Sequence, residues 1–167
     1  NYNNVITVNP NAEPQIGLTD NIDNIASVKQ LTASINEAAR NLERLGGGVI
    51  YLPEGDYYLT TGVELRSGVI LVGAGVDKTR LFYVGSGNGH LIRAYNQMSG
   101  YVTGFDNVGA ARMSVSAWKN STNTPNYIFN FGDGDRDLKL SSSRNKFISD
   151  IRVDLPLVRT ENEANSA

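Results

Sequence analysis

The spacing of apolar residues changes from helical to strand-like at a run of three glycines, residues 46–48. Between residues 27 and 45 apolar residues recur every three or four positions, as on one face of an amphipathic helix. Ser27 followed by Gln30 is typical of a capping box, and Gly46 stands where a C-terminal cap is expected. We therefore predict a helix over residues 27–45, with an apolar face of Val28, Leu31, Ile35, Ala38, Ala39, Leu42 and Leu45.

After Gly48 the apolar residues form short runs between Gly, Asn and Pro. The runs are three to five residues long and rich in β-branched and aromatic side chains, which is typical of strands. With 17 Gly and 19 Asn, the chain has many residues that tolerate positive φ in turns. We predict strands at 49–52, 57–59, 63–65, 69–72, 81–84, 91–95, 101–103 and 113–115.

These apolar runs repeat. The run at Val49 recurs at Val69, Leu91 and Met113, in steps of 20, 22 and 22 residues. A regular period of this size predicts a solenoid, in which each coil buries its apolar face by stacking on the next. A further run begins at Phe147, 34 residues after Met113, and we interpret residues 119–145 as an insertion that loops out from one coil.

The two ends of the chain differ from the repetitive part. Residues 1–26 contain no Lys or Arg, and we expect an extended lead-in or linker in which the short run at Val5 is a candidate strand. Residues 27–155 then hold the helix and the coils, and 156–167 form a polar end without a strand pattern. We expect the chain to be the N-terminal part of a longer protein.

The order of these motifs resembles the start of the pectate-lyase-like right-handed parallel β-helices. The resemblance rests on the helix, on Gly46-Gly47-Gly48 followed by Pro53-Glu54-Gly55-Asp56-Tyr57, on residues 65–75 and on Thr79-Arg80-Leu81. It implies an all-β fold, a right-handed parallel β-helix of about four to five coils with an N-terminal amphipathic capping helix. Such a helix hides the apolar interior and the unpaired edge of the first coil.

Composition excludes several classes of function. A net charge of -2 gives no basic field for nucleic-acid binding, and no run approaches the ~20 apolar residues of a membrane span. The chain has no Cys, which excludes disulfides, thiolate metal sites and a cysteine nucleophile. Its one histidine, His90, excludes a multi-histidine zinc site. We predict no cofactor.

Three aromatic residues near predicted strand ends, Tyr95, Trp118 and Tyr127, are candidate substrate-binding residues. A flat aromatic ring suits the apolar face of a sugar, although aromatic residues also fill cores and interfaces. His90, beside a turn, is interpreted either as a sugar-orienting residue or base, or as a turn histidine bonded to the backbone.

Acidic residues gather at two places. Asp133-Gly134-Asp135-Arg136-Asp137 begins like a calcium loop, but Leu138 and Asn145 occupy the positions that require Gly and Glu, so we predict a solvated turn and no metal site. Asp150 and Asp154, with Arg144, Arg152 and Arg159 nearby, are interpreted either as acid–base groups or as structural ion pairs. No residue is assigned a catalytic role.

The family resemblance implies extracellular polysaccharide chemistry. We expect part of a phage tailspike-like protein that binds bacterial surface polysaccharide, with two alternatives: a secreted bacterial lyase or glycoside hydrolase, and a non-enzymatic structural or receptor-binding β-helix. Whether the polysaccharide is also cleaved stays open, and catalytic residues are then expected outside this chain. The expected partners are carbohydrate, two further copies in a homotrimer and other virion tail proteins, and the expected location is the virion tail or the extracellular space.

Overall fold

The computed structural model describes residues 3–9, 25–60, 62–84, 90–94, 106–117, 125, 127–131 and 145–154; for residues 25–30 and 117 it describes the backbone alone. Tyr95 and Trp118 lie outside the described residues, as do the acidic segment 133–137, Arg144 and Arg159.

The predicted helix is confirmed as α1, Ile25–Arg44. Its last turn is closed by two backbone bonds, from Gly46 N to Glu43 O and from Gly47 N to Leu42 O, and Gly46 has φ 86°. This pattern is a Schellman motif, and it confirms Gly46 as the C-terminal cap. The same motif turns Leu45 away from the helix face, so its prediction as part of that face is wrong: Leu45 is 61% exposed.

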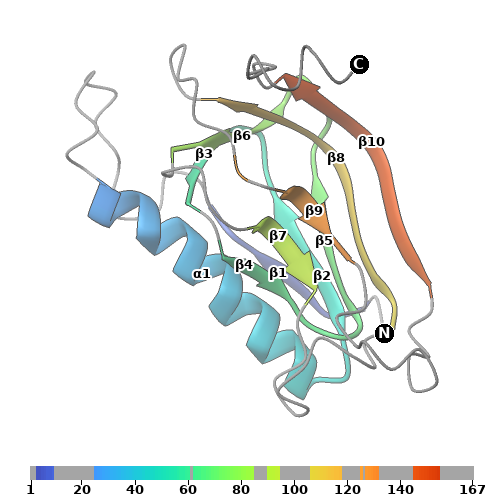
Figure 1. The fold of residues 1–167 in the computed structure, drawn as a ribbon. Helices are drawn as coiled ribbons and strands as arrows, with labels where there is room; N and C mark the ends of the chain where they lie inside the picture. Colours follow the sequence, from blue (N-terminus) through green and yellow to red (C-terminus); the bar gives the residue numbers. More distant parts are fainter. Residues whose placement is uncertain are drawn as a thin grey trace, which may run out of the picture.

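The strands form two sheets in which every pairing between described strands is parallel. The seven-stranded sheet contains β1 (Val5–Thr7), β2 (Gly48–Leu52), β3 (Gly55–Leu59), β5 (Val69–Gly73), β6 (Thr79–Tyr83), β8 (Val108–Ala117) and β10 (Lys146–Asp154). The three-stranded sheet contains β4 (Val63–Leu65), β7 (His90–Ala94) and β9 (Tyr127–Asn130). Figure 1 shows these strands curling around one interior, with α1 at one end of the stack and β10 at the other. The fold is the expected parallel β-helix.

One expected stacking partner is wrong. Val49 lies beside Ile70, and Ile70 beside Gly109, but Leu91 belongs to β7, which pairs with β4 and β9 in the other sheet. The run at Leu91 is apolar like the runs before it because it is buried in the same core. It faces that core from the three-stranded sheet, whereas the earlier runs face it from the seven-stranded sheet. β9 lies within the segment 119–145, and its four residues are a regular strand of the stack.

The later coils turn their corners differently from the first two. A turn separates β5 from β6, whereas β8 continues across the same corner as one bent strand and pairs with both. The bend in β8 falls at Arg112, which has φ 64° and whose carbonyl accepts a hydrogen bond from Gly75 N. Asp150 of β10, with φ 50°, repeats the bend in the next coil.

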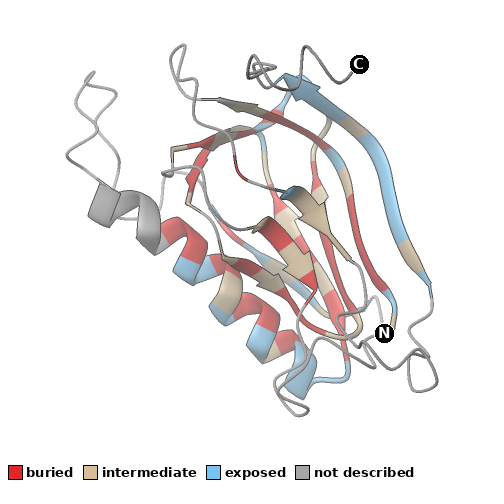
Figure 2. Ribbon diagram, in the orientation of Figure 1, coloured by how far each residue is buried: buried red, intermediate tan, exposed pale blue. Residues whose placement is uncertain are grey.

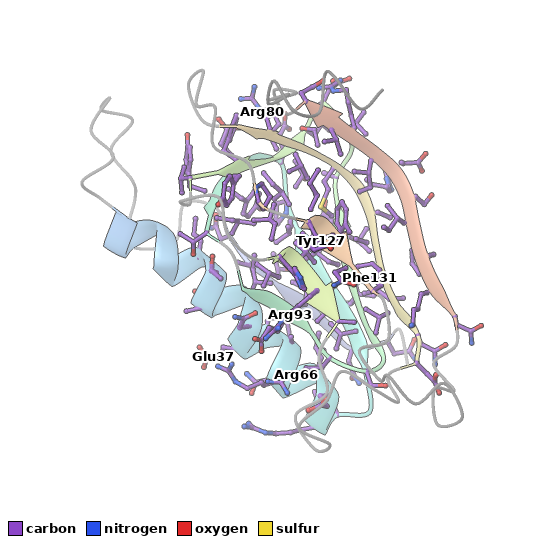
Figure 3. All side chains as sticks on the ribbon, viewed as in Figure 1. Glu37, Arg66, Arg80, Arg93, Tyr127 and Phe131 are labelled. Atoms are coloured by element: carbon purple, nitrogen blue, oxygen red, sulfur yellow. The ribbon has the colours of Figure 1, made fainter. Side chains whose placement is uncertain are left out.

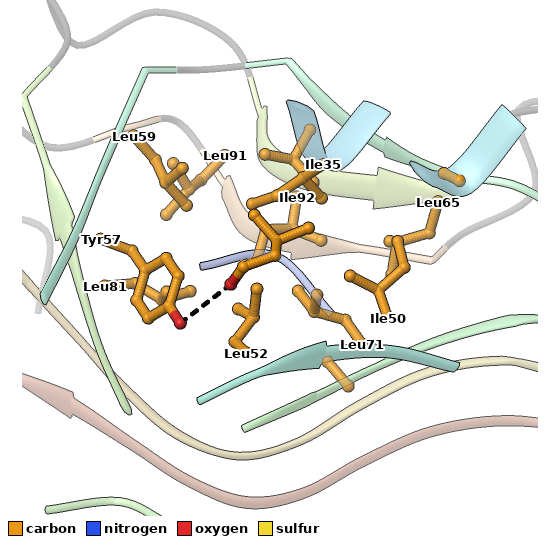
Figure 4. Close-up of a cluster of buried hydrophobic side chains, with 14 of the residues drawn as sticks. Ile35, Ile50, Leu52, Tyr57, Leu59, Leu65, Leu71, Leu81, Leu91 and Ile92 are labelled. Carbon is orange, nitrogen blue, oxygen red and sulfur yellow. Dashed lines mark hydrogen bonds between the residues drawn. The ribbon is translucent and has the colours of Figure 1, made fainter. Parts of the chain in front are cut away.

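The core lies between the two sheets and beneath the helix (Figures 2 and 4). Leu52, Leu71, Leu81 and Leu91 are fully buried there. Tyr57 is also fully buried, and its hydroxyl lies 2.8 Å from Pro53 O and 3.2 Å from Val8 O. This contact ties the segment before the helix to the first coil.

Helix α1 closes the first coil with polar side chains as well as apolar ones. Asn36 donates from Nδ2 to Gly62 O at 2.8 Å and accepts at Oδ1 from Glu64 N at 2.7 Å. Thr32 Oγ1 accepts from Thr60 N at 3.3 Å. The backbone of β4 that has no neighbouring strand on this side is therefore paired by the helix, which is how a protein protects a sheet edge. Within the described residues, this helix is too polar to cross a membrane.

Candidate carbohydrate-binding surface

The exposed aromatic residue predicted from the sequence, Tyr127, lies on the three-stranded sheet beside His90. The two residues open β9 and β7 and face each other in register. Their rings meet edge to face, with centroids 4.9 Å apart and an interplanar angle of 87°, and Tyr127 is 57% exposed. Asn130 Nδ2 lies 3.3 Å from His90 Nδ1 and donates to it in the tautomer that carries the ring proton on Nε2. His90 is thus a strand residue held by two side chains.

Charged residues occupy the other end of the same sheet. Glu64 of β4 lies beside Arg93 of β7, and Arg93 Nη2 is 2.7 Å from Glu64 Oε1. Arg66, with 4% of its side chain exposed, places Nη2 3.9 Å from Glu64 Oε2. Figure 3 shows Arg66 and Arg93 toward the helix and Tyr127 toward β9. Because Asn36 also holds Glu64 N, the helix fixes the backbone that carries this ion pair.

This arrangement matches the chemistry of a sugar. An exposed aromatic ring accepts the apolar C–H face of a pyranose, and amide, imidazole, carboxylate and guanidinium groups bond its hydroxyls. The described residues contain no group of three or more His, Asp or Glu that is arranged to hold a metal ion.

The two acids near the end of the chain have different surroundings. Arg152 bonds Asp154 at 3.0 Å and Asp77 at 2.7 Å, so the ion-pair interpretation is the one that describes Asp154. The hydrogen bond and the charge of Asp77 raise the pKa of the Arg152 guanidinium. Asp150 occupies the bend of β10, with Ser149 Oγ 3.5 Å from its carboxylate.

Another ion pair on the seven-stranded sheet, between Arg80 and Asp56, was missed by sequence reasoning. Arg80 donates two hydrogen bonds to Asp56, at 2.7 and 2.9 Å, and its guanidinium carbon lies 5.7 Å from the centroid of the Phe82 ring. Tyr58 stacks on Phe82 at 5.5 Å. The signal in the sequence is a repeated spacing, since Asp56 and Tyr58 are two residues apart, as are Arg80 and Phe82, on strands that become neighbours.

Comparisons with known proteins agree with this fold. A family model, rhamnogalacturonase A/epimerase, pectate lyase-like, matches residues 23–131. Among solved structures, the chain is similar to the A-module of the mannuronan C-5 epimerase of Azotobacter vinelandii, with 24% identity and a TM-score of 0.52. The similarity covers 73% of this chain but 33% of that one, so this chain spans about a third of its length. No curated protein matches the sequence significantly. The chain belongs to the rhamnogalacturonase A/epimerase, pectate lyase-like family.

Proposed function

We propose that the chain binds polysaccharide on the outer surface of its coils and is part of a carbohydrate-active β-helix protein. The observation that carries the proposal is the exposed ring of Tyr127, held edge-on by His90 on the sheet that also carries the Glu64–Arg93 ion pair. Family membership supports it, since that family is named for polysaccharide-active enzymes. The similarity to an epimerase of mannuronan concerns the fold.

The described surface favours binding over bond cleavage. The carboxylates of Asp56, Glu64 and Asp154 each bond an arginine. A carboxylate that already accepts hydrogen bonds from an arginine has fewer lone pairs left to contact a reacting substrate. If the whole protein cleaves or epimerises its polysaccharide, as a lyase, hydrolase or epimerase, the catalytic groups are expected outside the described residues.

We further propose that the protein is tailspike-like, with bacterial surface polysaccharide as its ligand and a homotrimer in the virion tail as its assembly. The alternatives are a secreted lyase or hydrolase and a non-enzymatic structural β-helix. Native mass spectrometry of the natural polypeptide tests the assembly. A mass three times that of the denatured chain supports the tailspike proposal, and a monomer contradicts it.

Replacement of Tyr127 tests polysaccharide binding directly. Removing an aromatic contact worth about 1.4 kcal/mol weakens binding roughly tenfold. Tyr51→Ala is the matched control, because Tyr51 lies on the outer side of β2 in the other sheet. The assay is calorimetric titration of both variants with bacterial surface polysaccharide fragments. Equal affinities for the Tyr127→Ala and Tyr51→Ala variants would rule out the Tyr127 site.

A further inference from the structure

The outer side of β3, β6, β8 and β10 carries two aligned rows of side chains. Buried residues alternate with these positions along β6, and the strand registers align them from strand to strand. We call these eight residues the ion-pair face: one row is Asp56, Arg80, Ser114 and Arg152, and the other is Tyr58, Phe82, Ser116 and Asp154.

One side of the ion-pair face combines an aromatic surface with a fixed cation. Phe82 is half-buried, stacks with Tyr58 and lies beneath the Arg80 guanidinium. The two hydrogen bonds from Arg80 to Asp56 hold that guanidinium in one orientation. Tyr58 itself is buried, so it supports the Phe82 ring from below.

The other side is a second arginine between two carboxylates. Arg152 bonds Asp154 within β10 and Asp77 from the turn that follows β5. Half of the Arg152 side chain is exposed, as is more than half of each carboxylate residue. Donors and acceptors therefore alternate along this edge.

Between the two sides stand serines. Ser116 is half-buried, and Ser114 is covered almost completely by its neighbours. β6 and β10 are both neighbours of β8, so the long side chains on either side stand roughly 10 Å apart, twice the ordinary strand spacing. Because Ser116 is short, no long side chain at this position separates Phe82 from Asp154, its neighbours on either side.

The charges on this face identify the kind of ligand. Asp56, Asp77 and Asp154 face two arginines, and each arginine already bonds at least one of these carboxylates. With Lys78, Arg112 and Asp150 nearby, four acidic residues meet four basic ones, so an anionic sugar would find no net positive charge to hold it. A neutral sugar pairs its hydroxyls with the carboxylates as donors and with the guanidinium groups as acceptors, and its C–H face with Phe82.

We propose that the ion-pair face is a second saccharide-binding surface, which takes uncharged hexose residues across Ser116 between Phe82 and Arg152. The inference rests on the proposed function, because it adds a binding surface to a polysaccharide-binding protein. The protein would then contact saccharide on both sheets, because Tyr127 and His90 lie on the three-stranded sheet and the ion-pair face lies on the seven-stranded one.

NMR titration of the isotope-labelled chain tests this proposal. The probes are maltohexaose, cellohexaose and mannohexaose as neutral oligosaccharides, and hexagalacturonate as an anionic one. We expect at least one neutral probe to shift the backbone amide signals of Ser114 and Ser116, and hexagalacturonate to leave them unchanged. Shifts confined to Tyr127 and its neighbours would overturn the second surface and leave the proposed function intact. Larger shifts at Ser116 with hexagalacturonate would overturn the neutral assignment. No shift at either surface would overturn both.

Two variants with a matched control complete the test. Ser116→Leu fills the space between the two sides, and Phe82→Leu removes the aromatic ring but keeps an apolar side chain. Ser149→Leu is the control, because Ser149 is an exposed serine of β10 outside the ion-pair face. We expect both variants to weaken binding of the neutral probe about tenfold, a loss of about 1.4 kcal/mol, and the control to bind normally. Equal affinity of the Ser116→Leu and Ser149→Leu chains would refute the surface.

Discussion

Replacement of Asn36 by alanine tests whether the helix is held on the β-helix by its polar contacts with the first coil. Asn36 makes two hydrogen bonds to the backbone of the strand below it, one to Gly62 O and one from Glu64 N, at 2.8 and 2.7 Å. At about 1 kcal/mol each, their loss costs roughly 2 kcal/mol. Alanine has a higher helix propensity than asparagine, which offsets about 0.6 kcal/mol of this loss in stability.

The expected net destabilisation is therefore about 1.5 kcal/mol, or a fall in Tm of roughly 3–6 °C for a chain of this size. It is measured by urea unfolding, with the slope against urea used to check that both variants unfold alike. Hydrogen exchange adds a local readout, since the Glu64 amide should lose its protection before other strand amides do.

Asn41→Ala is the control, because Asn41 lies on the same helix and bonds only Arg44 among the described contacts, at an exposed position. Asn41→Ala brings the same gain in helix propensity but breaks no contact with a strand. The stability of this variant should therefore differ from that of the unchanged chain by less than about 0.5 kcal/mol. If the two alanine variants unfold within about 0.5 kcal/mol of each other, the polar contacts do not hold the helix and apolar burial alone does.

Other predictions concern backbone strain and the buried tyrosine. Gly47→Ala should destabilise the chain by more than about 1 kcal/mol and by more than Gly46→Ala, because Gly47 has φ 111° and its Cβ would meet Gly68 O at 2.7 Å, whereas nothing lies within 4 Å at Gly46; equal thermal shifts would contradict this. Tyr57→Phe should cost about 1–2 kcal/mol in urea unfolding, since Val8 O and Pro53 O lose their shared donor. Burial raises the pKa of Tyr57 above the ordinary value of 10.0, so its contribution is complete below pH 10 and is lost as the pH rises beyond it. The decline of stability above pH 10 should be shallower for Tyr57→Phe, and an unchanged slope would contradict this sign.

The helix and most strands are predictable because each is marked by its own residues. The helical spacing from Leu31 to Leu42 corresponds to a buried face, and the glycines after it carry the positive φ angles that end the helix. Leu45 is the instructive failure, since it continues the helical spacing but follows the last helical residue. The spacing of apolar residues alone therefore does not show at which residue the helix ends.

The binding surfaces were less predictable because they depend on the register between distant strands. Tyr127 stands beside His90 across an offset of 37 residues, and Arg80 stands beside Asp56 across one of 24. Neither pair can be recognised until the coil lengths are known. An exposed aromatic residue can be proposed from its type and position, but the side chains that hold it come from other coils.

The coil lengths follow from a column of left-handed residues at one corner of the stack, and not from the apolar runs. Gly47, Gly68, Asn107 and Asn145 all have positive φ, and the strand registers place them in one column at the start of successive coils. Asn145 Nδ2 donates to Asn107 Oδ1 at 2.9 Å, which confirms the alignment of the last two. Their spacings, 21, 39 and 38 residues, are the true lengths of the coils. Buried apolar runs occur on every side of a β-helix and so cannot distinguish one side from another. Left-handed residues also occur at the bend of β8 and β10, where they are Arg112 and Asp150. Within the described residues, only the corner at which each coil begins uses Gly or Asn throughout.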